Sequence, residues 1–229
     1  SGYDPNNPYA NRDPRFYNTI VYDQKTLRNG STLNVPVNIF TGNYNGTPSG
    51  QDAVFTGTPT GYYGNKQLHR SIAANYFIGG PQSRPLIRFA EILLSYAEAQ
   101  NEFGGPTPEV YQVLKDIRMR GGIEPGADGM YGLKDGMNQE EMREAIRHER
   151  RIELAIEGLR FWDVRRWMIA EDTESKTMHG MEVQRDGAEV NYRRFEVRTR
   201  VFRRATYFWP IPYSEVAKSP ELKQNPYYE

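Results

Sequence analysis

The spacing of apolar residues along the chain changes near residue 86 and again near residue 170. Residues 1–85 are rich in Gly, Pro, Asn, Thr and Tyr with little helical periodicity, which predicts loops and short strands. Residues 86–170 repeat apolar side chains every three or four positions, which predicts amphipathic helices. Residues 171–229 combine a hairpin signal with several prolines, which predicts short strands and ordered loop. We expect the three segments to form one unit with helical hairpins as its scaffold.

The central segment predicts a pair of helices over about 86–103 and 107–120. Gly104-Gly105 ends the first helix, and Thr107 with Pro108 begins the second, because threonine caps well and proline suits the first turn. So short a connection makes the two helices antiparallel neighbours. The expected apolar faces consist of Phe89, Ile92, Leu93, Tyr96, Ala99 and Phe103 on the first helix, and Val110, Val113, Leu114 and Ile117 on the second.

Two more helices are predicted after a glycine-rich loop. Asn138 and Glu141 have the spacing of a capping box, and the third helix should then run to Glu157, with Gly158 as its C-terminal cap. The run FWDVRRWMI predicts a shorter fourth helix. Consecutive helical hairpins of this length favour a mainly α, tetratricopeptide-like α-α superhelix with long irregular loops and a few short β-hairpins, although no fixed-period repeat is visible.

Asn-Gly and Asp-Gly pairs mark turns in the flanking segments. Asn29-Gly30 predicts a β-hairpin because these residues readily adopt the positive φ angles of a two-residue turn, and Asn45-Gly46 and Asp186-Gly187 are signals of the same kind. Residues 41–64 contain so much Gly, Pro and Thr that we expect a long excursion with a functional role or high mobility. The run RTRVFRR at 198–204 predicts a strand with a solvated or ion-paired face.

Glu149 and Glu153 fall inside the predicted apolar stripe of the third helix. A carboxylate that faces a core is costly unless it is paired or saturated with hydrogen-bond donors. We therefore predict a buried network that joins two consecutive helices. A glycosidase pair is the less favoured alternative, because two carboxylates on one helix point along one wall instead of flanking a bond. The predicted donors to this network are Arg160, Arg165, Arg166, Trp162 and Trp167.

The overall charge restricts the class of partner. Lys plus Arg and Asp plus Glu each number 29, so no net field favours nucleic acid or an anionic membrane. The absence of cysteine excludes disulfides, zinc-thiolate sites and thiol catalysis. No apolar run is long enough to span a bilayer. The chain opens with a loop-like sequence that has no initiator Met or signal peptide, from which we expect a fragment or a processed chain.

Motifs for catalysis or metal binding are not found in the sequence. His69, His148 and His179 are widely separated, and the HExxH pattern fails because residue 152 is Ile, so we expect no metal site and no cofactor. No GxSxG elbow occurs, and we expect no enzyme activity. The run RDPRF could form an anion clasp, but it favours a turn at Asp13 whose arginines pair with acids on the helices.

Five stretches together resemble the carboxy-terminal half of the SusD/RagB family of nutrient-binding lipoproteins. In chain order, these stretches are NRDPRFYNTIVYD at 11–23, LIRFAEILLSYAEAQNEFG at 86–104, VLKDIRMRGG at 113–122, RHERRIELAIEGLRFWDVRRW at 147–167 and FWPIPYSEVAKSPELKQNPYY at 208–228. The most specific motifs within them are ERRIEL with EGLRFWDVRRW, and PIP followed by QNP. The resemblance implies a binding protein, not a hydrolase. It implies an outward-facing, lipid-anchored protein at the outer membrane that holds glycans, or in some members peptides, for a SusC-like TonB-dependent barrel. The family's signal peptide, lipidated cysteine and amino-terminal half have no counterpart in this chain.

Aromatic side chains in loops are the candidate ligand contacts, because ring faces stack on sugars while neighbouring polar groups bond the hydroxyls. The family has no motif for its ligand residues, so the choice depends on composition and position in the loop-rich segment. The alternative role of each tyrosine is to hold a loop onto the scaffold. A helical-repeat adaptor that binds another protein remains a second functional hypothesis. The candidate ligand residues are Tyr44, Tyr62, Tyr63, Asn45, Tyr9 and Arg12.

Overall fold

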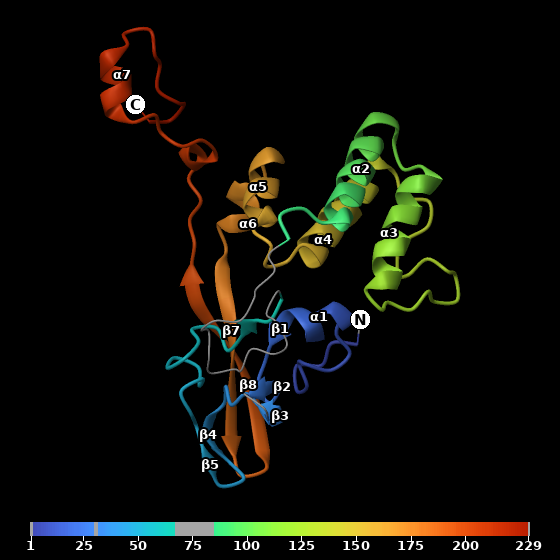
Figure 1. Ribbon diagram of the computed structural model, residues 1–229, viewed down its shortest axis with the longest axis vertical. Helices are drawn as coiled ribbons and strands as arrows, with labels where there is room; N and C mark the ends of the chain where they lie inside the picture. The colour runs from blue at the N-terminus through green and yellow to red at the C-terminus, as the bar shows by residue number, and fades with distance from the viewer. Residues whose placement is uncertain (1, 30–31, 67–84, 229) are drawn as a thin grey trace.

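The computed structural model describes residues 2–29, 32–66 and 85–228 (Figure 1). Helices gather at one side of a long β-hairpin, and the C-terminal segment extends beyond them (Figure 1). The helices are α1 (Pro14–Thr19), α2 (Phe89–Gly104), α3 (Pro108–Arg120), α4 (Gln139–Glu153), α5 (Leu159–Arg166), α6 (Ala170–Glu174), the 3-10 turn η1 (Arg204–Tyr207) and α7 (Tyr213–Lys218). The strands are β1 (Ile20–Val21), β2 (Thr26–Asn29), β3 (Thr32–Pro36), β4 (Thr41–Tyr44), β5 (Thr47–Pro48), β6 (Tyr63–Gly64), β7 (Thr177–Asp186) and β8 (Glu189–Thr199). Within the described ranges, no helix has the length and apolar character needed to cross a membrane.

The largest sheet joins distant parts of the chain in the order β5-β4-β7-β8. Strand β4 pairs in parallel with β7, while β7 and β8 form an antiparallel hairpin whose turn follows Asp186. Asn45 and Gly46, with φ of 48° and 83°, form the turn between β4 and β5. Strands β2 and β3 also pair antiparallel. The turns predicted at Asn45-Gly46 and Asp186-Gly187 are therefore confirmed, and β2 and β3 pair as expected for the hairpin predicted around Asn29-Gly30, whose Gly30 lies outside the described residues.

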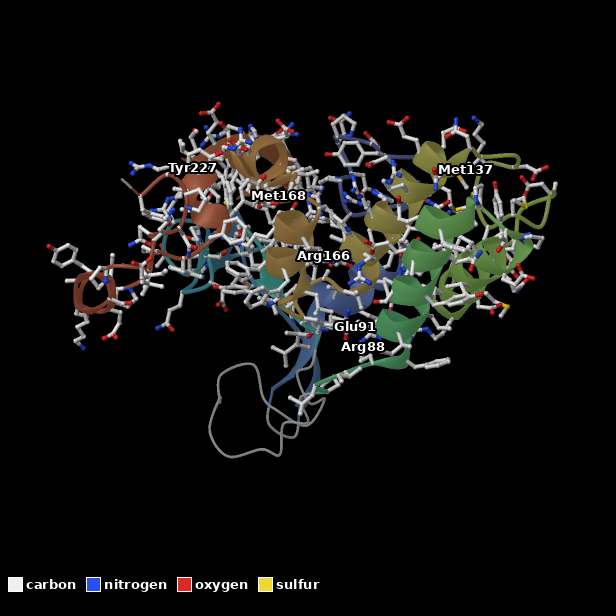
Figure 2. All side chains as sticks on the ribbon, turned by 90° about the horizontal axis from the view of Figure 1, so that it is seen from above. Arg88, Glu91, Met137, Arg166, Met168 and Tyr227 are labelled. Atoms are coloured by element: carbon white, nitrogen blue, oxygen red, sulfur yellow. The ribbon has the colours of Figure 1, made fainter. Side chains whose placement is uncertain are left out.

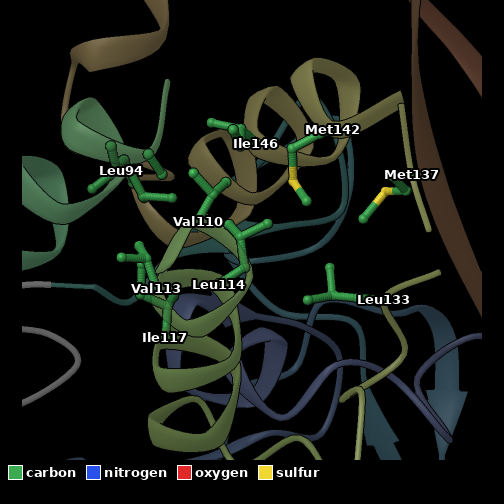
Figure 3. Close-up of a cluster of buried hydrophobic side chains, with 11 residues drawn as sticks. Leu94, Val110, Val113, Leu114, Ile117, Leu133, Met137, Met142 and Ile146 are labelled. Carbon is green, nitrogen blue, oxygen red and sulfur yellow. The ribbon is translucent and has the colours of Figure 1, made fainter. Parts of the chain in front are cut away.

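The helical core lies where α2, α3 and α4 meet (Figure 3). Val110, Val113, Leu114 and Ile117 of α3 point into it, as their spacing predicts, and Met142 and Ile146 come from α4. The capping box at Asn138 and Glu141 is present and starts α4 as predicted. Together these contacts fix the position of α4, which carries Glu149 and Glu153.

The predicted apolar face of α2 is wrong except at Leu93, which is half-buried and packs against the helical core. The buried residues of this helix are Ala90, Leu94, Ala97 and Asn101. Phe89 and Phe103 are 75% and 91% exposed instead. Ala97 lies in the core contact beside Leu94, and the Asn101 side chain donates a hydrogen bond to the Gln139 carbonyl, so small and polar residues line part of this contact. An apolar count could not distinguish the two faces of so apolar a helix.

Other corrections concern where elements end. Helix α4 stops at Glu153 instead of Glu157, Ile156 has a left-handed φ of 67°, and Gly158 precedes α5. Strand β8 ends at Thr199, so the strand predicted over 198–204 forms only at its beginning, and Arg204–Tyr207 turns as a 3-10 helix. The C-terminal segment, whose prolines are expected to exclude helix through most of its length, contains the short helix α7 directly after Pro212. Figure 2 shows Tyr227 of this segment on the side opposite Met137.

Candidate functional site

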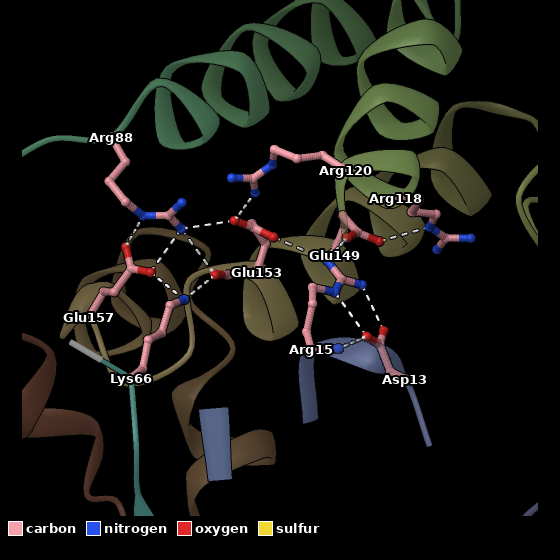
Figure 4. Close-up of polar contacts among 9 residues, drawn as sticks. All are labelled: Asp13, Arg15, Lys66, Arg88, Arg118, Arg120, Glu149, Glu153 and Glu157. Carbon is pink, nitrogen blue, oxygen red and sulfur yellow. Dashed lines mark hydrogen bonds and ion pairs between the residues drawn. The ribbon is translucent and has the colours of Figure 1, made fainter. Parts of the chain in front are cut away.

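Three carboxylates on α4 and the following turn, Glu149, Glu153 and Glu157, form the main polar network of the described chain (Figure 4). Their cationic partners come from α1, from the second residue after β6, from the residue before α2 and from α3. Those partners are Arg15, Lys66, Arg88, Arg118 and Arg120. The network therefore connects segments that are far apart in sequence.

The geometry saturates both inner carboxylates. The oxygens of Glu149 accept from Arg15 at 2.5 Å and from Arg118 Nε at 2.8 Å. Glu153 accepts from Arg15 at 3.2 Å, from Arg88 at 2.9 Å and from Arg120. Burial raises the pKa of Glu153, but hydrogen bonds from Arg120 and Arg88 outweigh burial and hold the pKa below its usual value. An ionised carboxylate held by three guanidinium groups is a poor proton donor, so this geometry favours the structural role over the glycosidase alternative.

Asp13 and Arg15 behave as the turn interpretation of RDPRF predicts. Asp13 caps α1 and accepts from Arg15 Nη2 at 2.8 Å, which aims the guanidinium at Glu149 and Glu153. Burial lowers the pKa of Arg15, but its bonds to Asp13 and Glu149 raise the pKa above its usual value. The predicted pairing with helix-borne acids is confirmed for Arg15, which lies in α1, but not for Arg12, which donates to the Pro8 carbonyl.

The predicted partners of this network are wrong. Arg160 lies 3.5 Å from Glu174, and Trp162 is 62% exposed. Arg165 stacks on the ring of Phe161. The early end of α4 and the left-handed residue that follows it turn α5 away, so none of the described donors to Glu149 or Glu153 comes from α5.

A second set of ion pairs connects α4 with α5. In this set α4 supplies the cation and α5 the carboxylate. Arg150 of α4 makes two 3.0 Å hydrogen bonds to the buried Asp163 of α5. Arg166 donates to Asp163 and to Glu98 of α2, and the Trp167 indole donates to Glu98 at 2.7 Å. Two consecutive helices are thus joined by a buried ion pair as expected, but α4 supplies the cation and α5 the acid.

The candidate ligand tyrosines separate by burial. Tyr9 is 8% exposed and belongs to a buried cluster with Phe40, Met181 and Val183, against which Tyr44 and Tyr62 pack. Burial, followed by the charges of Tyr62 and Asp23, raises the pKa of Tyr9 above its usual value. These rings hold loops onto the sheet, which is the alternative role considered for them.

Arg12 and Asn45 lie apart from each other. The Arg12 guanidinium stacks over the rings of Tyr3 and Phe16, at 5.5 and 4.8 Å from the centroids. Asn45 is exposed at the tip of the β4–β5 turn, beyond Tyr44, whose ring carries the guanidinium of Arg185 at 4.2 Å. The structure does not bring the six candidate residues together into one site.

A groove between residues 55–59 and strand β8 is the better candidate site. It has a volume of about 310 Å³ and is lined by Phe55, Thr56, Gly57, Thr58, Pro59, Phe195, Glu196 and Val197. Phe55 is 65% exposed and lies 5.0 Å from the ring of Phe195, with its backbone at a left-handed φ of 69°. Such a backbone is strained for a bulky residue, and strain of this kind is concentrated at functional sites.

Tyr63 places polar groups beside this groove. Its hydroxyl donates to Asp52 Oδ1 at 3.1 Å, and burial together with the charge of Asp52 raises the pKa of Tyr63 to about 12. A Cβ at Gly57 would lie 2.3 Å from the Gln51 carbonyl oxygen and 2.6 Å from the Tyr63 hydroxyl, so glycine is required by the backbone contact and lies beside Tyr63. The exposed Phe55 ring beside a carboxylate and a hydroxyl suits a shallow polyol ligand. Among the predicted residues only Tyr63 lies here; sequence reasoning noted Phe55 only as part of residues 41–64 and missed Phe195.

Comparisons with known proteins support the resemblance found in the sequence. The family model described as the SusD family matches residues 1–228. The SusD-like proteins P2 and P25 of Formosa agariphila are 34% identical over 86 residues and 30% identical over 143 residues, covering 38% and 62% of this chain and 17% and 24% of those proteins.

Solved structures agree with the sequence matches. A SusD-like protein of Bacteroides fragilis matches with a TM-score of 0.77 at 30% identity, over 96% of this chain and 40% of that one. A SusD-like carbohydrate binding protein of Bacteroides fragilis matches with a TM-score of 0.67 at 30% identity, over 96% and 43%. This chain therefore spans less than half the length of the structures it matches, and it has the SusD-like fold. The chain belongs to the SusD family.

Proposed function

We propose that this chain is part of an outer-membrane-associated, outward-facing protein that captures glycans and passes them to a SusC-like TonB-dependent barrel. Membership of the SusD family supports this role, as does the similar Bacteroides fragilis protein described as carbohydrate binding. The proposed activity is binding without turnover. In this proposal α2, α3 and α4 are part of a tetratricopeptide-like superhelix, and a lipid anchor outside this chain holds the protein at the membrane.

The Phe55 groove is the proposed glycan contact within this chain. The observation that carries the proposal is the exposed Phe55 ring, held by a left-handed backbone against Phe195. The apolar C–H face of a pyranose can stack on this ring, while Asp52, Glu196 and the Tyr63 hydroxyl accept or donate hydrogen bonds at the sugar rim. An open groove of this size accommodates a short stretch of a glycan, but it does not enclose a ligand deeply.

Affinity electrophoresis against a panel of polysaccharides tests the proposal. The unaltered chain should be retarded by at least one polysaccharide, and Phe55→Ala should lose most of that retardation, since a stacking ring contributes about 1–2 kcal/mol. Phe103→Ala is the matched control, because this ring is equally apolar, 91% exposed and on α2. If both variants lose the same amount of retardation, the groove is not the glycan contact. Retention of peptides in place of polysaccharides would favour the peptide-binding alternative.

A further inference from the structure

A second, larger groove is lined by residues of α5, α6, the end of β8 and the segment that follows β8. Figure 1 shows α5 and α6 beside the chain that leads from β8 to the C-terminal segment. Its volume is about 710 Å³. The apolar part of its lining consists of Phe161, Val164, Val201 and Phe202. The charged part consists of Arg160, Arg165, Arg198, Arg200 and Glu174. Four guanidinium groups thus face one carboxylate inside a chain whose net charge is zero.

The cations of this groove are poorly neutralised. Glu174 lies 3.5 Å from Arg160. Burial, and also the nearby Arg151, lower the pKa of Arg160, although Glu174 opposes them. Arg198 and Arg200 extend from the exposed end of β8 and the residue that follows it. The local field therefore attracts anions, and added carboxylates would relieve the repulsion among the arginines.

Arg165 is held in place before any ligand arrives. Its guanidinium lies 3.5 Å from the centroid of the Phe161 ring and 5.1 Å from that of Phe202. One Nη1 hydrogen bond to the Phe161 carbonyl, at 3.0 Å, fixes its direction. Its buried Nε has no hydrogen-bond partner among the described residues. A guanidinium fixed between rings with donors to spare suits a bidentate carboxylate.

The ring faces decide between a sugar and a peptide. Arg165 covers Phe161 and Phe202, Trp162 packs against Phe161 at 4.9 Å, and Tyr207 packs against Phe202 at 4.9 Å. Rings so covered offer little face for a pyranose to stack on. The apolar lining that remains open is Val201, which is 78% exposed, because Val164 is 2% exposed and packs with Ala170 and Tyr207; Val201 suits an aliphatic side chain instead.

We propose that the Arg165 groove binds an acidic, extended peptide segment of a partner protein, with carboxylates on the arginines and an aliphatic side chain on the exposed Val201. The segment is identified by alternating acidic and apolar residues, which is complementary to this lining. This site is separate from the Phe55 groove, which is bounded by a different part of β8 and by residues 55–59.

Fluorescence anisotropy with the whole chain and a short labelled peptide that alternates Glu with Leu tests the proposal. Binding should be saturable at low ionic strength and should weaken as salt is added. Arg165→Gln should lower the affinity about tenfold or more. Arg165 is packed between rings, so its replacement could also disturb the fold. The double variant Arg198→Gln and Arg200→Gln changes only exposed side chains and tests the same groove with the fold intact. Arg194→Gln, an exposed arginine on β8 outside the groove lining, is the matched control and should bind normally.

Several results would overturn the proposal. These are no binding at low salt, equal binding of the peptide with Gln in place of Glu, and unchanged binding by the variants at Arg165 or at Arg198 and Arg200. Displacement by oligogalacturonate at equal carboxylate concentration would assign the groove to an anionic glycan instead. Polysaccharide retardation through Phe55 should be the same in all these variants, so failure of this proposal and failure of the proposed function are distinguishable.

Discussion

Removal of one carboxylate from the α4 network should destabilise the whole fold. Glu153→Gln keeps the shape of the side chain but removes the charge that faces Arg15, Arg88 and Arg120. The Glu153 side chain is 4% exposed, so its arginine partners would be left near a neutral amide with few routes to water. The expected effect is on stability, because each partner belongs to a different segment of the chain.

The magnitude follows from the burial of the partners. Loss of one member of a buried ion pair costs about 3–5 kcal/mol. Arg15 is 12% exposed and Arg88 21%, but Arg120 is 56% exposed and its pair with Glu153 is screened by water. We therefore expect a loss near the lower end, about 3 kcal/mol in the free energy of unfolding. For a chain of this size that corresponds to a fall in Tm of roughly 6–12 °C.

Thermal and urea unfolding, followed by circular dichroism, measure the effect. Glu144→Gln on the same helix is the matched control, because Glu144 is 67% exposed and its pair with Arg147 is a surface contact worth less than about 0.5 kcal/mol. If the two variants unfold at the same temperature and urea concentration, the network does not hold the segments together and the argument from burial is refuted.

Further predictions concern pH and backbone strain. The folded-state pKa of Glu153 is lowered, so its contribution is present above the unfolded value of about 4.3 and is lost as the pH falls through the folded pKa; acid titration of unfolding should be steeper for the unaltered chain than for Glu153→Gln, and equal slopes would contradict this. Phe55→Gly should be about 1 kcal/mol more stable than Phe55→Ala in urea, since glycine alone adopts a φ of 69° without strain, and equal midpoints would show that the backbone is unstrained. Gly61→Ala should lower the free energy of unfolding by about 3 kcal/mol or more, because its Cβ would lie 2.0 Å from the Met181 carbonyl oxygen. Gly158→Ala, at a similar φ with open space around it, should lower it by only about 1 kcal/mol. Similar losses in the two variants would mean that the contact at Gly61 relaxes.

Local signals predicted local structure. The turns at Asn45-Gly46 and Asp186-Gly187, the capping box at Asn138 and the buried face of α3 each depend on neighbours within a few residues, and the structure confirms them. The same holds for the burial of Glu149 and Glu153, since their place in the stripe follows from helical spacing alone.

Contacts between distant segments were not predictable in this way. Glu149 and Glu153 find Arg15 more than one hundred residues earlier in the chain, and no local pattern marks that arginine among many. The pairing of Phe55 with Phe195 likewise depends on the parallel pairing of β4 with β7, which brings residues 41–64 beside the late hairpin. Both faces of α2 are apolar, and only the approach of α3 and α4 decides which one is buried. The contacts between segments that are distant in sequence therefore could not be predicted from local patterns.

Hydrogen exchange of the chain with and without a retarding polysaccharide tests the central claim most directly. If the Phe55 groove holds the glycan, protection should concentrate at residues 52–63 and 193–197, and it should disappear in Phe55→Ala while Phe103→Ala keeps it. Protection confined to other parts of the chain, or protection that Phe55→Ala leaves unchanged, would contradict the assignment of this groove as the glycan contact.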